Sequence, residues 1–318
     1  MCGLHINELH QRSLNENLDG PTSSDTGFSG PLGKALEKVS TLELNPAFES
    51  IVTSEDLPPM PDEVAKNLST DQKHSFKLWN AIRTGIVSVE LDSLACGKID
   101  HARWLTTANR FLVLWTKKHG FEEENLENLQ TIVMWIVGSY FPMWFHMKIH
   151  HHWINGHKHL LQQIVLWREQ PELSMAFTHD TIQSGAYYGH SEHVLQTLLC
   201  STEEDDRRFA VNKILQLREE RNTRLVEPLL KKFKQTKETN LINIRARKNP
   251  ELDMEATSLK NMINWESDVH EPVLTCELTN EELMHFYEQP MQVPVIGLHT
   301  QNIERCVKQV IVIHNKVY

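Results

Sequence analysis

The sequence predicts a mainly α-helical fold that returns to a strand and a helix near its C-terminal end. Apolar residues recur at helical spacings through most of the stretch from Ser69 to Glu169. Val293–His299 is then a short β-prone run, and Thr300 is a good N-cap for a helix that follows it. A strand and a helix after so long a helical stretch indicate an α/β core interrupted by a large helical insertion.

Composition and charge restrict the classes of function. The chain has 318 residues, of which 40% are apolar and 23% charged, as in a soluble globular protein with a substantial core. The formal net charge of −10 excludes a surface that is basic all over. Because phosphate binding depends on Lys and Arg, any contact with DNA must be local.

The segment Arg207–Lys248, in which Lys and Arg outnumber Asp and Glu, is the best place for such a contact. A solvated helical face with its exit loop is the alternative interpretation of this segment. The candidate DNA-binding residues are Lys231, Lys232, Lys234, Arg245 and Arg247.

The five cysteines are scattered and form no CxxC pair, so they predict neither a disulfide framework nor a thiolate zinc site. Cys2 and His5 could both reach a zinc ion from one helical turn, but no second pair of ligands is evident, and a packed Cys–His pair is the alternative. No secretory signal is visible at the N-terminus. We therefore expect an intracellular protein.

The most apolar run, Ile132–Phe145, predicts a buried helix rather than a membrane span. It is shorter than the roughly 18 residues that suggest a span. It also contains Pro142, where we expect the helix to kink or end. No membrane is expected as a partner.

The predicted elements follow in chain order. Composition predicts a loop in LDGPTSSDTGFSGPLGK, a short helix in ALEKVSTLEL, and an extended connector in Leu57–Glu63. Ser69 or Thr70 caps the next helix, in which apolar residues recur at helical spacings, namely Phe76, Leu78, Trp79, Ile82 and Ile86. The further helices are Asp100–Gly120, Leu126–Phe141, Asn155–Trp167, His190–Leu199, Glu203–Arg221 and two short ones between Pro250 and His285.

The N-terminal string CGLHINELHQR, followed by the Gly/Pro-rich loop, resembles the CxxH segment of hAT-related transposases. That family often has C-x-L-H-x-N-E-L at this point, shortly after its second catalytic aspartate. The matching residues are Cys2, Leu4, His5, Asn7, Glu8 and Leu9.

The C-terminal string PVIGLHTQNIERCVKQV resembles that family's last signature, in which Glu-Arg opens a helix after a short strand. The resemblance implies that Glu304 is the third catalytic carboxylate and Arg305 its basic neighbour. It also implies an incomplete RNase H-like core, with residues 1–35 and 286–318 as its two pieces and residues 36–285 as the helical insertion.

The resemblance further implies a metal-dependent DNA strand-transfer enzyme. RNase H-type cleavage uses two divalent ions, Mg²⁺ or Mn²⁺, roughly 4 Å apart and held by several carboxylates. The family's pattern places both aspartates ahead of Met1, and Asp19 and Asp25 lie in the Gly/Pro loop, where they are poor substitutes. Glu304 alone is an incomplete metal site, so we expect a truncated remnant that binds no metal stably and is inactive by itself.

Three further features have competing interpretations. Without the resemblance, Glu304 is a first-turn glutamate that stabilises a helix N-terminus. Trp153 could stack on DNA bases, but most tryptophans at helical spacing belong to a core. The histidine cluster could bind metal or could lie at solvated helix ends, and it comprises His146, His150, His151, His152, His157 and His159.

No Walker A loop, GxSxG or HExxH motif is present, which disfavours nucleotide hydrolysis, serine hydrolysis and zinc proteolysis. The competing prediction is therefore a non-catalytic helical module for DNA binding or protein interaction. DNA and a homo-oligomer are the partners to test, and a functional DNA-binding protein of this kind is expected in the nucleus.

Overall fold

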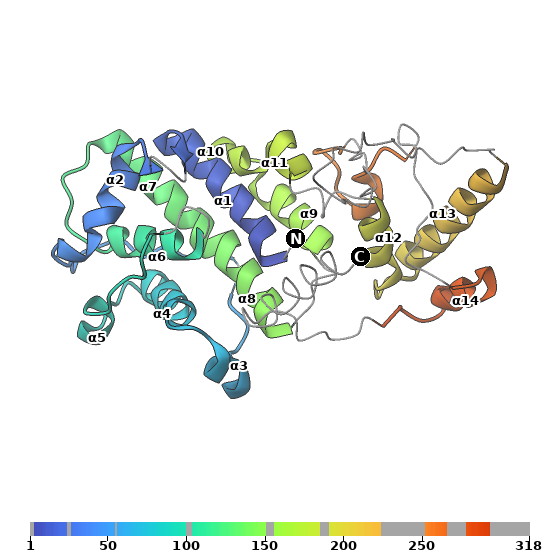
Figure 1. Ribbon diagram of the computed structural model, residues 1–318, viewed down its shortest axis with the longest axis horizontal. Coiled ribbons are helices and arrows are strands. Elements are labelled where there is room, and N and C mark those ends of the chain that lie inside the picture. The colour runs from blue at the N-terminus through green and yellow to red at the C-terminus, as the bar shows by residue number, and fades with distance from the viewer. Residues whose placement is uncertain are drawn as a thin grey trace, which may run out of the picture. The chain divides into compact units, whose positions relative to one another are not determined.

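The computed structural model describes residues 3–23, 27–54, 56–99, 104–150, 156–184, 191–223, 252–265 and 278–292 (Figure 1). These residues form two compact units. Unit 1 takes in the described residues up to 150 and residues 166–182, and unit 2 takes in residues 156–165 and the described residues from 183 to 292. The predicted domain boundaries at residues 35 and 285 came from the family resemblance. They differ from the boundaries of these two units, and they stay a prediction.

Unit 1 is helical, with one two-residue antiparallel hairpin that pairs Thr22 with Phe28. The predicted mainly α fold is therefore confirmed for the residues described. The elements of unit 1 are α1 (Gly3–Asp19), β1 (Thr22–Ser23), β2 (Gly27–Phe28), α2 (Pro31–Ala35), η1 (Leu36–Thr41), α3 (Asp62–Asn67), α4 (Thr70–Thr84), α5 (Val89–Asp92), α6 (Trp104–Trp115), α7 (Glu123–Trp135), η2 (Ile136–Tyr140), α8 (Phe141–His150), α10 (Pro171–Ser174), η4 (Met175–Phe177) and α11 (His179–Ser184), of which the last two residues lie past the unit boundary.

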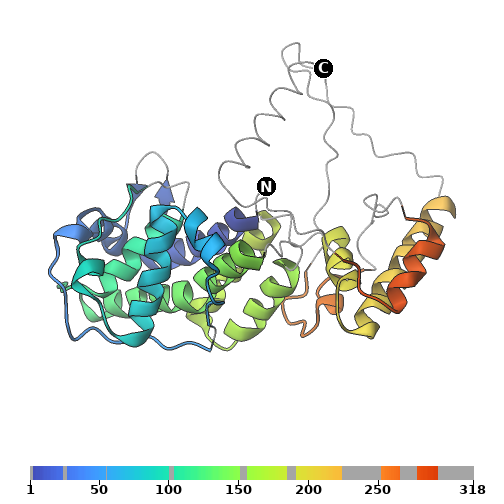
Figure 2. The same cartoon turned by 90° about the horizontal axis from the view of Figure 1, so that it is seen from below.

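The core of unit 1 lies where α1, α4, α6, α7 and α8 meet. Helix α1 packs against α6, α7 and α8, and α6 packs against α4 and α7 (Figure 2). The largest side chains that are fully buried there are Phe111, Trp135, Tyr140, Phe141 and Phe145. Within the described ranges, no helix combines the length and the apolarity needed to cross a membrane.

Helix α4 begins and ends as local signals require. Ser69 forms a capping box with Gln72, as the predicted N-cap should. Gly85 ends the helix in the left-handed conformation, with φ 71°. Of the apolar residues at helical spacing, Leu78, Trp79 and Ile82 are buried, whereas Ile86 follows that turn and is 71% exposed.

Helix α6 buries Trp104, Ala108, Phe111 and Leu112, but it ends at Trp115 rather than at the predicted Gly120. The next residues leave the helix to pair with an earlier segment. Lys117 forms an isolated antiparallel bridge with Leu44, and the Lys118 amide donates to the Glu43 carbonyl at 2.8 Å. The predicted helix end at Gly120 was wrong, because the residues after Trp115 pair with a segment that is far away in the sequence.

The apolar run Ile132–Phe145 is a buried helical core element, as predicted, but it does not end at Pro142. Helix α7 continues through the π-helical turn η2 into α8, and Pro142 lies in the first turn of α8. The Phe141 amide donates to the Ile136 carbonyl, five residues back. Proline is tolerated here because the helix changes its hydrogen-bond register before reaching it.

The predicted loop after α1 is shorter than its composition suggested, since it contains β1, β2 and α2. Asp19 closes it. The two carboxylate oxygens of Asp19 accept hydrogen bonds from the amides of Leu32 and Gly33 at 2.9 and 2.7 Å. Asp19 is therefore a structural cap for the start of α2.

Unit 2 contains α9 (Gly156–Trp167) up to Val165, α12 (Ser191–Leu199), α13 (Glu204–Thr223), η5 (Leu259–Asn261), α14 (Asn280–Met284) and η6 (His285–Tyr287). The predicted helices Asn155–Trp167, His190–Leu199 and Glu203–Arg221 are confirmed to within two residues at their ends. Helix α13 has acidic residues in its first turn, where they suit the helix dipole. It packs against α12, α14 and η6. The predicted strand Val293–His299 and the helix after Thr300 lie outside the described residues.

Candidate functional site

The residues that resemble the CxxH segment lie on α1. Cys2 is outside the described residues, His5 and Asn7 are on the helix, and Glu8 is described and buried. Helix α1 packs against the π-helical turn η2. Single π-helical turns inside α-helices occur frequently at functional sites. We therefore take α1 and η2 together as the candidate functional site.

Two tryptophans satisfy polar groups of η2. In the π register, the carbonyl of Val137 would accept from residue 142, but proline has no N–H to donate. The indole N–H of Trp79 donates to this carbonyl at 2.9 Å. The indole N–H of Trp167 donates to the Ser139 hydroxyl. Side chains distant in the sequence thus complete the hydrogen bonding of η2.

Gly138 allows Trp167 to approach the helix backbone. A Cβ atom at this position would lie 2.9 Å from the Trp167 ring and 3.0 Å from the Thr53 side chain. These distances are below normal van der Waals contact. Residue 138 must therefore be glycine for this packing of the indole.

Helix α1 turns a polar face into the interior. Glu8, Gln11 and Asn15 are all buried, at spacings that place them on one side of a helix. The Gln11 amide nitrogen donates to the Asn15 carbonyl oxygen at 2.9 Å. The other amide group of each of these two side chains, Gln11 Oε1 and Asn15 Nδ2, has no hydrogen-bond partner among the described residues.

Trp135 and Tyr140, on the helical segment that faces α1, each add one more buried polar atom without a hydrogen-bond partner among the described residues. Both side chains are fully buried, and neither the Tyr140 hydroxyl nor the Trp135 indole nitrogen has a partner within the described part of the chain. Burial raises the pKa of Tyr140 well above its usual value, and the charge of Glu8 raises it further. Tyr140 is therefore a neutral phenol at physiological pH.

His10 is held in one neutral form at the edge of the site. Its ring lies 5.1 Å from Phe177, which in turn lies 5.1 Å from Trp135. His10 Nδ1–H donates to the Ala176 carbonyl at 3.1 Å, which fixes the tautomer. Burial lowers the pKa of His10 to about 4, more than this hydrogen bond raises it. His10 is thus uncharged at neutral pH.

The arrangement supplies hydrogen-bonding groups in a packed interior. Glu8 contributes the charge, while Gln11, Asn15, Trp135 and Tyr140 contribute neutral donors and acceptors. Within the described ranges, no three side chains of His, Cys, Asp or Glu gather as metal ligands. In the described structure these polar groups lie in the packed interior where α1 meets α7 and η2.

The predicted catalytic and DNA-binding residues fall elsewhere. Glu304, Arg305, Lys231, Lys232, Lys234, Arg245 and Arg247 all lie outside the described residues. The structure therefore leaves the inherited metal-ligand position of Glu304, with Mg²⁺ or Mn²⁺ as its ion, as a prediction.

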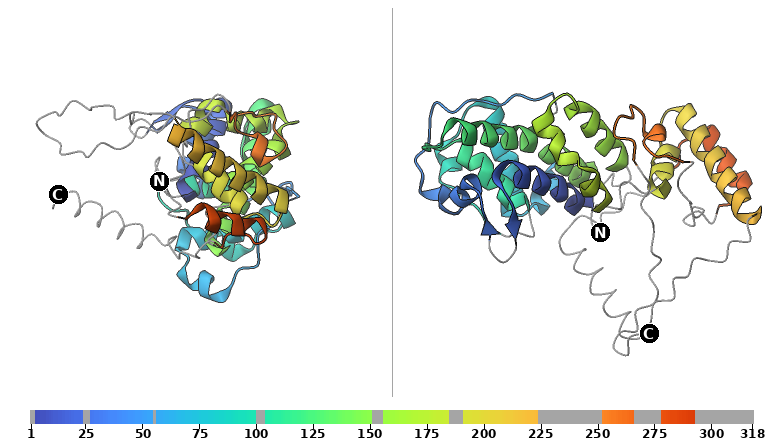
Figure 3. Two further views of the ribbon diagram at one scale, coloured as in Figure 1. Left: turned by 90° about the vertical axis from the view of Figure 1, so that its right-hand side faces the viewer. Right: turned by 90° about the horizontal axis from the view of Figure 1, so that it is seen from above.

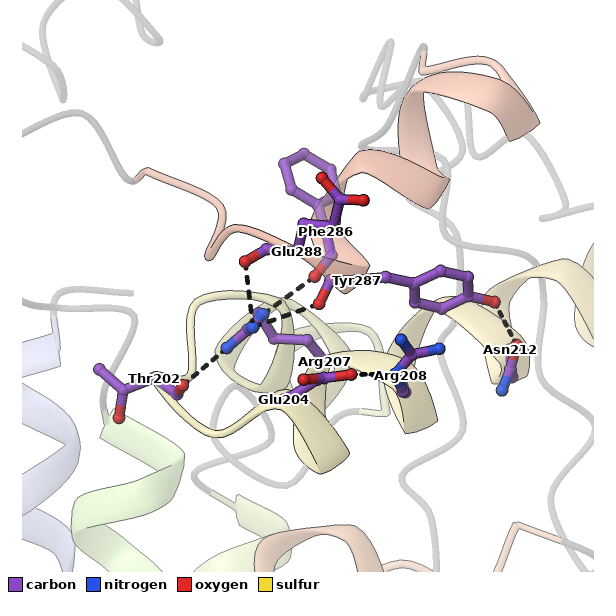
Figure 4. A network of polar contacts seen from close by, with 8 residues as sticks. All are labelled: Thr202, Glu204, Arg207, Arg208, Asn212, Phe286, Tyr287 and Glu288. Carbon is purple, nitrogen blue, oxygen red and sulfur yellow. Dashed lines mark hydrogen bonds and ion pairs between the residues drawn. The ribbon is translucent and has the colours of Figure 1, made fainter.

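The start of the predicted basic segment is engaged within the protein (Figure 4). Arg207 is 5% exposed and donates to backbone carbonyls. Arg208 pairs with Glu204 and covers the Tyr287 ring at 4.8 Å. Arg218 donates to Asn280 at 2.7 Å. These three arginines therefore make contacts within unit 2, and the predicted DNA contact stays a prediction.

The histidine cluster is divided between the two units. His146 lies on α8 in unit 1, whereas His157 and His159 lie on α9 in unit 2. His157 is buried and stacks on His193, with ring centroids 5.5 Å apart. The side chain of His150 and the residues His151 and His152 lie outside the description.

Most described tryptophans belong to the core, as predicted. Trp153, the candidate for base stacking, lies outside the described residues. The buried tryptophans are Trp79, Trp104, Trp115, Trp135, Trp144 and Trp167.

The two described cysteines are free thiols with little thiolate character. Burial raises the pKa of Cys96, and it raises the pKa of Cys200 to about 11. A thiolate is the reactive form of cysteine, so neither thiol is poised as a nucleophile.

No protein-family model matches the chain, and comparison with curated proteins and with solved structures gives no match either. The resemblance to hAT-related transposases therefore depends on the sequence motifs at the two ends of the chain.

Sequence reasoning missed the buried polar face of α1. Glu8, Gln11 and Asn15 are residue types that normally mark a solvent-facing side. The π-helical turn η2 was missed as well. A signal for it was present, because Gly138 and Pro142 lie four residues apart in an apolar helix and both residue types are unusual in a helix interior.

Proposed function

We propose that this chain is a transposase-derived protein, the remnant of a metal-dependent DNA strand-transfer enzyme. In the complete enzyme, Glu304 would be one of the carboxylates that hold Mg²⁺ or Mn²⁺, beside Arg305. The proposal is supported by the motifs at both ends of the chain and by their order. A single carboxylate cannot hold two such ions, so strand transfer would require further carboxylates beside Glu304.

The catalytic part of the proposal is tested with purified protein and labelled duplex DNA carrying terminal repeats, in Mg²⁺ and separately in Mn²⁺. The expected result is no nicked and no joined product from either wild type or Glu304→Gln. Strand cleavage by the wild type that disappears in Glu304→Gln would contradict the inactive state and would instead support a working active site.

A non-catalytic module for protein interaction or DNA binding is the second candidate function. Val52, Ile86 and Val89 are 75%, 71% and 88% exposed around the end of α4. The backbone of residues 50–52 lies beside that end, where the Ile51 amide donates to the Ile82 carbonyl at 3.1 Å. A protein partner, including a second copy of the chain, is the binding partner to test at these side chains.

Binding assays separate the two versions of this second function. If the chain binds DNA through the basic segment, affinity falls with salt, and neutralising Lys231, Lys232, Lys234, Arg245 and Arg247 together removes most of it. If it forms homo-oligomers through the apolar residues, Val52→Ser with Val89→Ser lowers the mass measured by sedimentation. Nuclear accumulation of a fluorescent fusion would accompany the DNA-binding version.

A further inference from the structure

Residues 278–292, called the strap below, form a separate layer of unit 2 that lies along α13 (Figure 3). The strap comprises α14, η6 and the residues that flank them. It has its own start signal, because Thr279 and Glu282 form a capping box. Leu283 is its one buried side chain in the described structure. The strap therefore contributes little apolar surface to the core of unit 2.

Arg207 on α13 is the main link between the strap and the rest of the unit. Its guanidinium donates to the carbonyls of Phe286 at 2.9 Å, Tyr287 at 3.2 Å and Glu288 at 3.4 Å, all in the strap. It also donates to the carbonyls of Ser201 and Thr202, at 2.9 and 2.7 Å, in the loop before α13. Figure 4 shows this side chain between the two backbone segments.

The geometry depends on arginine. A guanidinium has five N–H donors in a planar fork, and here all three nitrogens are used at once. A lysine ammonium has three donors at one point and cannot reach both backbone segments in the same way. The C-terminal carbonyls of η6 also carry partial negative charge, which favours a cation at this place. The acceptors are backbone groups, so a substitution in the strap leaves them in place.

The remaining contacts of the strap are mostly at its surface. The Tyr287 hydroxyl donates to Asn212, Arg208 covers the Tyr287 ring, and Arg218 donates to Asn280. The Met291 amide donates to the Leu199 carbonyl at the end of α12, at 2.8 Å. Because its acceptor lies outside the strap, the Met291 amide reports directly on docking.

We propose that the strap is a detachable arm, which docks on and leaves α13 as one piece under the control of Arg207. Release breaks the Arg207 bonds to Phe286, Tyr287 and Glu288 and uncovers the site of Leu283, while α12 and α13 stay folded. The inference stands apart from the proposed function, because it depends only on contacts within unit 2.

Amide hydrogen exchange of the full chain, followed residue by residue by NMR, tests this proposal. In the wild type, the amides of Leu283, Glu288 and Met291 should exchange at similar opening free energies, and faster than the amides of α13. Arg207→Met should speed their exchange at least tenfold and leave Ile214 on α13 and Leu78 on α4 unchanged. Arg208→Met, which changes an exposed neighbour, is the matched control and should have a much smaller effect.

Two results would overturn the proposal. One is unchanged exchange of the strap in Arg207→Met. The other is an equal rise in exchange across the strap, α12 and α13, which would make Arg207 an ordinary part of one cooperative core. If Arg207→Met does not fold, Arg207→Lys replaces it, because lysine keeps the charge but cannot reach both backbone segments. The same two results then decide.

Discussion

The indole nitrogen of Trp79 donates a 2.9 Å hydrogen bond to the carbonyl oxygen of Val137, 58 residues away in the sequence. The π register of η2 directs that carbonyl toward Pro142, which has no N–H. The proline therefore creates an unmatched acceptor inside a buried helix, and a tryptophan from α4 satisfies it. This relationship explains how the apolar run continues through a proline.

Trp79→Phe should destabilise unit 1 by about 1–3 kcal/mol from the unsatisfied carbonyl, in addition to lost packing. In a Pro142→Ala background the same change should cost about 1 kcal/mol less, because the new amide at residue 142 can donate to Val137. Urea unfolding of the two single variants and the double variant measures this coupling. Trp104→Phe, another buried tryptophan on α6, serves as the control and should show no coupling with Pro142→Ala. Equal costs for Trp79→Phe in both backgrounds would count against the role of Pro142.

Gly138→Ala should destabilise unit 1 by about 1–3 kcal/mol, because the added methyl group would overlap the Trp167 ring. Trp167→Leu, which also removes the hydrogen bond to Ser139, should make the second effect of Gly138→Ala much smaller in the double variant. Thermal unfolding followed by circular dichroism measures both. A Gly138→Ala variant as stable as the wild type would show that the indole does not approach the backbone so closely.

The stability of unit 1 should fall between about pH 6.5 and pH 4 because of His10. Burial holds the pKa of the folded-state His10 at about 4, below its usual value of 6.5. The unfolded chain therefore binds a proton at pH values where the folded chain does not, and stability is lost as pH falls through this window. At about 1.4 kcal/mol for each pH unit, the loss approaches about 3 kcal/mol.

Urea unfolding of the wild type and of His10→Asn across pH 4–8 tests this dependence. The amide nitrogen of asparagine occupies the place of Nδ1, so it can donate to the Ala176 carbonyl, and it does not titrate; the wild type should therefore lose stability relative to the variant as pH falls. Burial lowers the pKa of His74 as well, and its contribution is common to both proteins. If the stabilities of the two proteins depended on pH in the same way, the pKa of His10 would not be lowered in the folded state.

Asp19→Ala should destabilise unit 1 by about 1–2 kcal/mol, because the amides of Leu32 and Gly33 lose their acceptors. Glu37→Ala, at an exposed position on η1, is the matched control and should change stability by no more than about 0.5 kcal/mol. Chemical unfolding measures both. Equal effects of the two substitutions would remove the capping role of Asp19.

Local signals predicted much of the helical fold. The Ser69 cap, the spacing of apolar residues on α6 and the acidic first turn of α13 each act within a few residues, so they could be read directly from the sequence. Where distant partners matter, the predictions were less accurate: the helix end at Gly120 was wrong, and of the kink or end predicted at Pro142 the end is excluded. Helix α6 ends early because Lys117 pairs with Leu44, and the helix passes through Pro142 because Trp79 supplies a donor.

The candidate site was harder to predict than the fold. Glu8 was identified from the resemblance, but Gln11, Asn15 and Tyr140 carry no motif and have polar groups that look solvent-facing in sequence. Their burial follows from the packing of α1 against α7, η2 and α8, which a single sequence does not specify. The predicted positions of Glu304 and of the basic residues Lys231 to Arg247 remain predictions.

The most direct test of the transposase ancestry is the distance between the two ends that resemble the family. Cys2 and Cys306 lie within those two motifs and can be spin-labelled after Cys96, Cys200 and Cys276 are replaced by alanine. Pulsed electron paramagnetic resonance should then give one narrow distribution at no more than about 30 Å, the diameter of a small domain. A broad distribution centred well beyond that distance would separate Glu304 from the CxxH segment and contradict a shared core.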